Sequence, residues 1–163
     1  MELRILTPKD VTKAYVEWMQ DREVVKYSEN QYKIFSINSQ KIYVKNCLSE
    51  KDIVLYGIFI NSKHVGNISL KGLNSKHKRA ELTYMIGVKQ LWGKGLGNQI
   101  VAKIVSKAKE EYKLKKLYAG VASENIASKK VLENNNFKLE GIRKKHLLLN
   151  NKFMDQLDYG LIL

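Results

Sequence analysis

The stretch QLWGKGLGNQIVAKIVSKA (Gln90–Ala108) places three glycines within five residues, directly before an amphipathic run. Glycine lets the backbone approach a ligand closely and adopt positive φ angles. A glycine-rich turn that opens a helix can bind an anion, because the first N–H groups of the helix have no acceptor within it. The stretch is therefore either an anion-binding loop or a plain turn between a strand and a helix.

Two common phosphate-binding motifs do not fit this loop. Its spacing Gly-Lys-Gly-Leu-Gly differs from the GxGxxG motif of dinucleotide-binding folds, and no acidic residue ends a strand about 20 residues later. The segments before it also look antiparallel. A P-loop fails as well, because no Gly-Lys-Ser or Gly-Lys-Thr follows at the required spacing.

Three apolar segments separated by short polar turns precede the loop. They cover residues 52–60, 64–73 and 79–88 and predict an antiparallel meander. After the loop, apolar residues recur on one helical face, at Ile100, Val101, Ile104, Val105, Ala108 and Tyr112. The loop therefore connects a strand to an amphipathic helix.

The remaining segments extend the pattern to a mixed α/β chain. Thr7 and Pro8 are typical of an N-cap and a first helical position, and they predict a helix as far as Gln20. Ser123 is the predicted N-cap of a later helix. The other predicted elements are a strand over residues 2–7, a helix from about residue 36 or 39, a strand over 115–122, a helix over 123–136 and a hairpin over 137–163 with its turn at 150–151.

The composition is that of a single globular domain over residues 1–163, since one proline and no Ser/Gly-rich stretch leave no evident linker. The formal net charge is +13, and lysine outnumbers arginine 25 to 4. Base readout and bidentate phosphate contacts favour arginine, and the lysines are spread along the chain, so a nucleic-acid partner is disfavoured. The charge fits either a lysine-rich composition bias or a field that draws anionic small molecules into a cleft.

Other protein classes are disfavoured by patterns that the chain lacks. A single cysteine, Cys47, excludes an internal disulfide, and its apolar helical neighbours indicate core packing. Three histidines, His64, His77 and His146, have no metal-ligand spacing. No apolar run reaches the roughly 18–20 residues that cross a bilayer, and the first residues do not form a signal peptide. We therefore expect a cytoplasmic protein with no metal and no membrane contact.

The loop and the segments around it resemble one known family. The stretches RAELTYMIGV (79–88), WGKGLG (92–97) and ASENIASKKVLENNNF (122–137) resemble the GNAT superfamily of acetyl-CoA-dependent N-acetyltransferases. The order of elements matches over nearly the whole chain. The resemblance implies an α/β fold with a central mixed, mostly antiparallel sheet of six to seven strands and about four helices. The most similar clade contains ribosomal-protein N-terminal, spermidine and amino-sugar-nucleotide acetyltransferases.

The resemblance implies acetyl-CoA as co-substrate and assigns it to particular residues. The coenzyme pyrophosphate would lie on the backbone of Gly93, Lys94, Gly95, Leu96, Gly97 and Asn98. The pantetheine arm would bond to open backbone groups at Met85, Ile86 and Gly87, as an added strand does. Asn125 matches the family asparagine that contacts this arm, whereas Trp92 stands where Gln or Arg is usual.

Acetyl transfer to an amine needs a neutral nucleophile, a stabilised oxyanion and a protonated leaving thiolate. Deprotonating a lysine-like amine at pH 7 costs roughly 4–5 kcal/mol, so a base or a water relay to one is useful. Glu81 is the candidate base, because family members often place a glutamate on this strand. The structural alternative is a strand carboxylate paired with Arg79 or Lys78. A backbone N–H within residues 85–87 would meet the oxyanion.

The proton donor to the thiolate departs from the usual family pattern. The family tyrosine, seven positions beyond the asparagine, is replaced by Leu132. Ser128 matches the serine of the clade and is the candidate donor, with an ordinary exposed helix serine as the alternative. Some N-terminal acetyltransferases carry a glutamate where this chain has Gly120, so that base is missing here.

The acceptor is expected over the first two helices and the final hairpin. In EWMQDREVVKYSENQY (17–32) aromatic residues stand beside carboxylates, which suits a sugar or an aliphatic amine. Trp18, Tyr27 and Glu29 are the candidate binding residues, and for Trp18 a core position is the alternative. His146 is left outside the catalytic set, because a lone histidine on a mixed strand is more often structural.

We favour a primary amine on a nucleotide-linked amino sugar as the small-molecule acceptor, since a positive protein suits an anionic nucleotide as well as coenzyme A. A protein N-terminus and a polyamine rank second and third, because ribosomal proteins and spermidine are cationic. A different class stays open, namely a non-catalytic acyl-CoA-binding module or an RNA-associated module. A homodimer paired through the final strand is compatible with the sequence.

Overall fold

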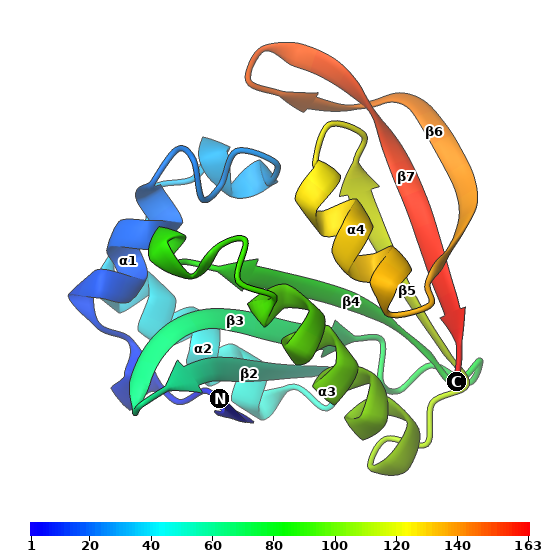
Figure 1. Cartoon of the computed structure of the whole chain (residues 1–163). Coiled ribbons are helices and arrows are strands. Elements are labelled where there is room, and N and C mark those ends of the chain that lie inside the picture. Colours follow the sequence, from blue (N-terminus) through cyan, green and yellow to red (C-terminus); the bar gives the residue numbers. More distant parts are fainter.

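The computed structural model describes residues 1–163 and shows a mixed α/β fold (Figure 1). Its seven-stranded sheet has the order β1-β2-β3-β4-β5-β7-β6, and every neighbouring pair is antiparallel except β4 and β5. The strands are β1 (Glu2–Ile5), β2 (Ile53–Ile60), β3 (Lys63–Lys71), β4 (Arg79–Ile86), β5 (Lys116–Ala122), β6 (Lys138–Leu149) and β7 (Lys152–Ile162). The helices are α1 (Lys13–Gln20), α2 (Ile37–Ser49), α3 (Leu96–Glu110) and α4 (Ile126–Asn134). The predicted fold class and element order are confirmed.

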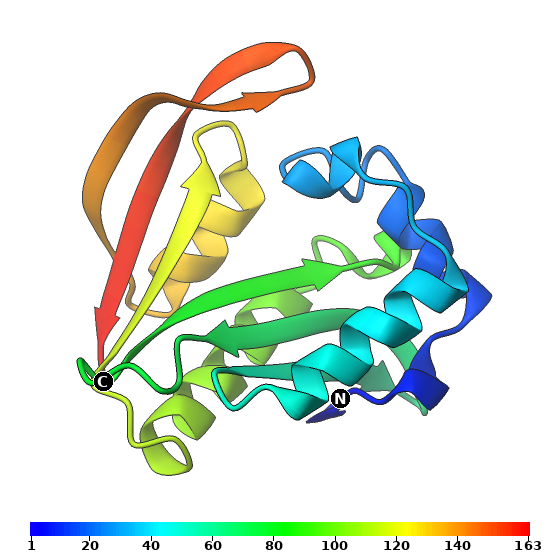
Figure 2. The ribbon, with the colours of Figure 1, turned by 180° about the vertical axis from the view of Figure 1, so that it is seen from behind.

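The helices cover both faces of the sheet. Helix α3 crosses β2–β4 on the face that Figure 1 shows, with α4 beside β5, and α2 covers the opposite face in Figure 2. Twenty buried residues form the main core beneath α3 and α4, and nine others, Cys47 among them, pack beneath α1 and α2. Cys47 therefore packs in the core, as expected. None of the helices is long and apolar enough to cross a membrane.

The sheet opens between β4 and β5. These two parallel strands pair only where residues 79–81 face residues 116–118, and they diverge beyond that point (Figures 1 and 2). The glycine loop lies between the open end of β4 and α3. The divergence leaves one side of β4 without a strand partner, and this edge faces the start of α4.

Two predicted helix starts were wrong. Thr7 and Pro8 open only a short 3₁₀ turn over Pro8–Asp10, and α1 begins after Thr12, whose Oγ1 accepts a hydrogen bond from the Tyr15 N–H at 3.3 Å. The chain is extended at Val11, which is buried, so one continuous helix is interrupted there. At α4 the N-cap is Asn125 rather than Ser123, because the Asn125 side chain accepts from the Ser128 N–H at 3.1 Å.

Candidate active site

A cleft of about 1360 Å³ occupies the opening of the sheet. Its walls are the end of β4, the glycine loop, the first turn of α3, the first half of α4, and the segment between α1 and α2. The cleft therefore brings together parts of the chain as far apart as Tyr15 and Asn134. It contains most of the residues that the sequence singled out, with exceptions described below.

The three loop glycines serve two different purposes. Gly93 and Gly95 have φ angles of +72° and +77°, and no atom lies within 4 Å of where a Cβ would stand. These two glycines shape the backbone and leave open space above it. Gly97 differs, because its Cβ would stand 2.8 Å from a methyl group of Val131 on α4. Gly97 thus permits close packing of α3 on α4, a role that the sequence did not suggest.

The first turn of α3 has the properties of an anion site. Gly95 is its N-cap and has no side chain that could accept a hydrogen bond, and the N–H groups of Leu96, Gly97 and Asn98 find no acceptor in the protein. Such groups, with the positive end of the helix dipole, attract phosphate. Lys94 lies within this loop with its side chain exposed, outside the residues that line the cleft.

The open edge of β4 differs by one residue from the predicted one. The Gly87 N–H donates to the Val65 carbonyl on β3 at 2.9 Å. Because backbone groups alternate between the two sides of a strand, Met85 also bonds toward β3, and Tyr84 and Ile86 face the gap. The prediction for Met85 and Gly87 was therefore wrong, and Ile86 is the residue that keeps it. The Ile86 carbonyl accepts from the Trp92 indole N–H at 2.9 Å, which fixes the loop to the strand.

Two hydroxyl groups meet across the gap. The Tyr84 hydroxyl lies 3.0 Å from the Ser128 Oγ, and either atom can donate. Burial raises the pKa of Tyr84, although the bond to Ser128 opposes the change in part. Asn125 lines the cleft beside Ser128, whereas Leu132 is fully buried in the main core. Sequence reasoning found Ser128 and missed Tyr84, whose partner is set by the fold and not by spacing.

Glu81 lies outside the cleft. It stands opposite Tyr118, where β4 and β5 still pair, and it forms no ion pair with Arg79 or Lys78. Side chains alternate along a strand, so Glu81 shares its face with Thr83, which does line the cleft. The Glu81 carboxylate thus lies on the same face of β4 as Thr83, two residues before it along the strand and outside the cleft.

Uncharged polar groups line the cleft on that same face of β3 and β4. The Ser69 and Thr83 hydroxyls are 2.7 Å apart, and Asn67 lies opposite Met85 in the register of the strands. Gln40 of α2 also lines the cleft and is only 4% exposed, and its Oε1 has no hydrogen-bond partner. Asn67 and Gln40 are residues that the sequence did not single out, because strand register and helix orientation bring them to the cavity.

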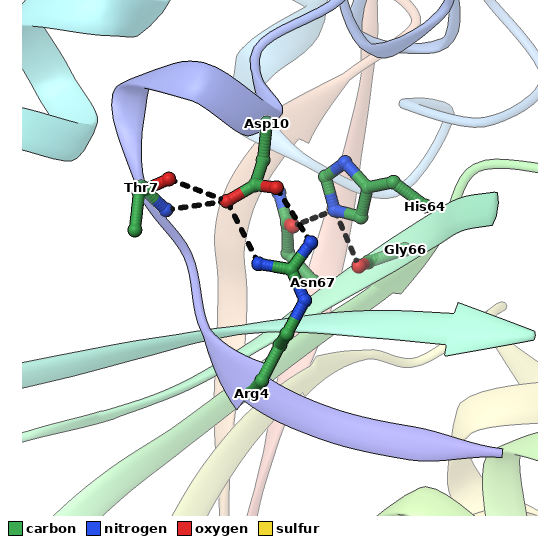
Figure 3. Close-up of polar contacts among 6 residues, drawn as sticks. All are labelled: Arg4, Thr7, Asp10, His64, Gly66 and Asn67. Atoms are coloured by element: carbon green, nitrogen blue, oxygen red, sulfur yellow. Dashed lines mark hydrogen bonds and ion pairs between the residues drawn. The ribbon is translucent and has the colours of Figure 1, made fainter. Parts of the chain in front are cut away.

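The orientation of Asn67 is fixed by a half-buried histidine (Figure 3). The Nε2 atom of His64 lies 2.9 Å from the Gly66 carbonyl oxygen and 2.8 Å from the Asn67 Oδ1. Because a carbonyl can only accept, Nε2 carries the proton, and burial lowers the pKa of His64 so that the ring stays neutral. With its oxygen bound to His64, Asn67 has only its amide N–H groups left as donors, and the Tyr15 hydroxyl is one partner for them.

The predicted acceptor residues are separated in the structure. Tyr27 lines the cleft. Trp18 does not, because it is 6% exposed and packs against Tyr15 and His64 and over Gly87. Glu29 lines a second cavity of about 340 Å³, together with His146 and the end of β6. The core position that was the alternative for Trp18 is therefore the observed one.

The charges at the cleft are mostly positive. Lys26, Lys33 and Lys130 line it, and Glu23 is the one carboxylate among the lining residues. Glu23 is paired with the Lys89 ammonium at 2.6 Å, and Asp21 holds the same ammonium at 2.8 Å. The cleft therefore offers an unpaired positive field and no free carboxylate.

Comparison with known proteins decides the family. The model of the acetyltransferase (GNAT) domain matches residues 1–138. The chain belongs to the GNAT family. The resemblance seen in the loop and in the Asn125 segment is thus confirmed.

Relatives and solved structures place the chain among GNAT proteins of several kinds. The uncharacterized N-acetyltransferase YoaA of Bacillus subtilis (strain 168) is 29% identical over 98 residues, which are 60% of this chain and 55% of that protein. The chain thus matches only about half the length of this curated relative. A spermidine N-acetyltransferase from Vibrio cholerae, solved with CoA and spermine, has a TM-score of 0.88 at 19% identity and covers 99% of this chain and 94% of that one.

A ribosomal L7/L12 α-N-protein acetyltransferase in complex with coenzyme A is equally similar in structure, with a TM-score of 0.88. It is 20% identical, over 99% of this chain and 93% of that one. At such identities the likeness concerns the GNAT fold alone. The acceptor must therefore be argued from the cleft of this chain.

Proposed function

We propose that this GNAT chain is an acetyl-CoA-dependent N-acetyltransferase that acts on a primary amine in a ternary complex. The observation that carries the proposal is the convergence in one cleft of an unpaired strand edge, the free N–H groups that begin α3, and the Tyr84–Ser128 hydroxyl pair. The pyrophosphate would lie on residues 93–98, with the pantetheine arm along Tyr84 and Ile86 and in reach of Asn125. The pantetheine arm carries amide groups, which can hydrogen-bond to an open strand edge as an added peptide strand does.

Residues of the chain would supply the polar groups of the reaction. Bound acetyl-CoA supplies a thioester whose carbonyl carbon is open to an amine. The Ile86 N–H faces the gap and would donate to the carbonyl oxygen as negative charge develops there. Ser128 would donate a proton to the sulfur. Bound acetyl-CoA and acceptor would displace water from this end of β4, which would strengthen each of these interactions.

The acceptor that fits best is an amino sugar carried on a nucleotide. The uncharged polar groups of Gln40, Asn67 and Thr83 suit hydroxyl groups, and Tyr27 offers an aromatic face for a sugar or base. Lys26, Lys33 and Lys130 suit the phosphates of the carrier. A polyamine is a poorer fit, because a polycation needs free carboxylates and the single lining carboxylate, Glu23, is already paired. A protein N-terminus ranks between them.

The base is proposed to be Glu81, acting through water along the face that it shares with Thr83. Its replacement by Gln should lower kcat at neutral pH and leave the KM for acetyl-CoA within about twofold. The rate of Glu81→Gln should then rise with pH, because a larger fraction of the amine is neutral without help. Measured kcat against pH for both proteins tests this, with Glu124→Gln as a carboxylate control outside the cleft. A Glu81→Gln profile identical to wild type would exclude the role.

The proposed function is tested in two stages. Melting is measured first with acetyl-CoA, with coenzyme A and with no ligand, since a ligand at about 100 times its Kd adds about 2.7 kcal/mol of stability. Thiol release from acetyl-CoA is then measured with a nucleotide-linked amino sugar, the same sugar without its nucleotide, an N-terminal peptide and spermidine. Preference for the nucleotide-linked sugar supports the proposal. Tight coenzyme binding with no turnover on any amine would indicate a non-catalytic module, and salt-sensitive RNA binding that acetyl-CoA does not compete would indicate an RNA-associated one.

A further inference from the structure

One hydrogen bond joins β4 to α4 across the opening of the sheet, and it lies between the hydroxyls of Tyr84 and Ser128. Both residues line the cleft from opposite walls. The Ser128 hydroxyl is not needed for the helix cap, because the cap uses the backbone N–H of Ser128 and the side chain of Asn125. Neither hydroxyl has another protein partner. The pair therefore faces the cleft with capacity for a third group.

Position 132 of α4, where the family usually has a tyrosine, holds a leucine that is part of the core. Leu132 is 0% exposed and packs in the main core with Phe137, one helical turn after Ser128, and it does not line the cleft. A phenol at this site must therefore come from another element. Tyr84 brings a phenol to the same helix from the opposite wall.

We propose that Ser128 and Tyr84 act as one proton-donating unit for the coenzyme sulfur, in which Ser128 contacts the sulfur and Tyr84 is a positioning residue that holds and reprotonates Ser128. The inference rests on the proposed acetyl transfer. As the carbon–sulfur bond breaks, its electron pair goes to sulfur, and sulfur takes the proton of the Ser128 hydroxyl. Ser128 regains a proton from Tyr84. Tyr84 is restored, through water, by the proton that the attacking nitrogen loses, so the sum is an amine and a thioester giving an amide and a thiol.

The protonation state of Tyr84 agrees with this role. Burial raises the pKa of its phenol, so the hydroxyl keeps its proton throughout the neutral range and remains a donor. The ring packs against the main core, which leaves the hydroxyl as the part that reaches the gap. Replacement by Phe should thus remove the hydroxyl and keep the packing.

Kinetics of four variants test the unit. Tyr84→Phe and Ser128→Ala should each lower kcat by about 10–100-fold, with the KM for acetyl-CoA within about twofold. The double variant should be no slower than Ser128→Ala alone, because groups that act as a unit are not additive. Tyr112→Phe is the matched control, since Tyr112 loses a similar hydroxyl contact, 2.6 Å to Tyr56, outside the cleft. An unchanged kcat in Tyr84→Phe, or multiplied effects in the double variant, would overturn the proposal.

A binding measurement separates this inference from the proposed activity. Calorimetry from about pH 6 to about pH 9 compares coenzyme A with desulfo-coenzyme A, which lacks the sulfur; thiols of this kind have a pKa near 8.5. In wild type the affinity for coenzyme A, relative to that for desulfo-coenzyme A, should rise with pH, because hydroxyl donors stabilise the bound thiolate. In Tyr84→Phe this rise should be lost. If this affinity ratio depends on pH equally in wild type and Tyr84→Phe, the proposed Ser128–Tyr84 unit is overturned, even if the protein acetylates an amine. Loss of the rise in a protein that acetylates no amine supports the pair and rejects the proposed activity alone.

Discussion

Asp10 shows how single side chains hold the N-terminal segment in place. Its carboxylate accepts from both terminal nitrogens of Arg4, at 2.6 and 3.1 Å, and from the Thr7 N–H and hydroxyl at 2.8 and 2.7 Å (Figure 3). The guanidinium of Arg4 also lies 3.8 Å over the Phe59 ring. The Asp10 carboxylate thereby links β1 to the 3₁₀ turn, and its partner Arg4 extends the contact to Phe59 of β2.

Asp10→Asn should make the protein less stable at neutral pH. Burial alone would raise the pKa of Asp10, but the hydrogen bonds from Arg4 and Thr7 outweigh it and lower the pKa to about 2. The unfolded value is about 3.9, so the contribution is complete above about pH 5 and is lost as pH falls from about 4 to about 2. We expect a loss of about 1–2 kcal/mol at pH 7 that shrinks toward pH 2, measured by urea unfolding.

The control is Glu17→Gln, which removes a carboxylate exposed at 62% and 3.6 Å from Lys13. It should change the free energy of unfolding by less than about 0.5 kcal/mol. If Asp10→Asn destabilised the protein equally at pH 2.5 and at pH 7, the ionised carboxylate would not be the cause. At pH 2.5 most of the contribution of the ionised carboxylate is already lost, whereas pH 7 lies well above the transition.

Helices α3 and α4 pack against each other where Gly97 faces Val131, and this contact sets the distance between the two helices. Gly97→Ala should destabilise the protein by about 1–3 kcal/mol, because the new methyl group would stand 2.8 Å from a Val131 methyl group. Val131→Ala in the same chain should restore part of that loss, as measured by urea unfolding of the single and double variants. If the two losses simply added, the helices would not be in contact through this pair.

Much of the element order followed from local signals. Polar turns, apolar periodicity and the glycine loop predicted seven strands and four helices in the observed order. The starts of α1 and α4 were wrong, because the chain is extended at the buried Val11 and because Asn125, not Ser123, accepts the capping hydrogen bond of α4. Tertiary position, and not residue type alone, decides where such helices begin.

The site was less predictable than the fold for the same reason. The open backbone of the loop could be inferred from glycine spacing, and the presence of Asn125 and Ser128 at the cleft from a motif. Tyr84 depends on which side of β4 faces the gap, and a shift of one residue reverses that answer. Trp18 belongs to a segment whose composition suits sugar binding, yet its side chain is buried beside His64.

At the scale of the whole molecule, we expect the net charge of +13 to act through the lysines that line the cleft. The affinity for coenzyme A should fall roughly tenfold between about 0.05 and about 0.5 M salt, because added ions screen Lys26, Lys33 and Lys130 from the phosphates. Calorimetry at several salt concentrations measures this. Lys130→Gln should weaken binding and flatten the salt dependence, whereas Lys129→Gln, which removes the neighbouring charge outside the cleft, should do neither. Equal effects of the two variants would mean that net charge, not the cleft, attracts the ligand.

The gap between β4 and β5 also gives the free protein a recognisable isotope-exchange pattern. Amides of β4 that bond to β3 are protected from exchange with deuterium, while the Tyr84 and Ile86 amides, which face the gap, are not. Along β4, which lies in the middle of the sheet, slowly exchanging amides should thus alternate with rapidly exchanging ones, as they do in a strand at the edge of a sheet. Coenzyme A should erase the alternation at these two amides. The ligand would then be detected by where deuterium stops entering, with no acceptor and no turnover required.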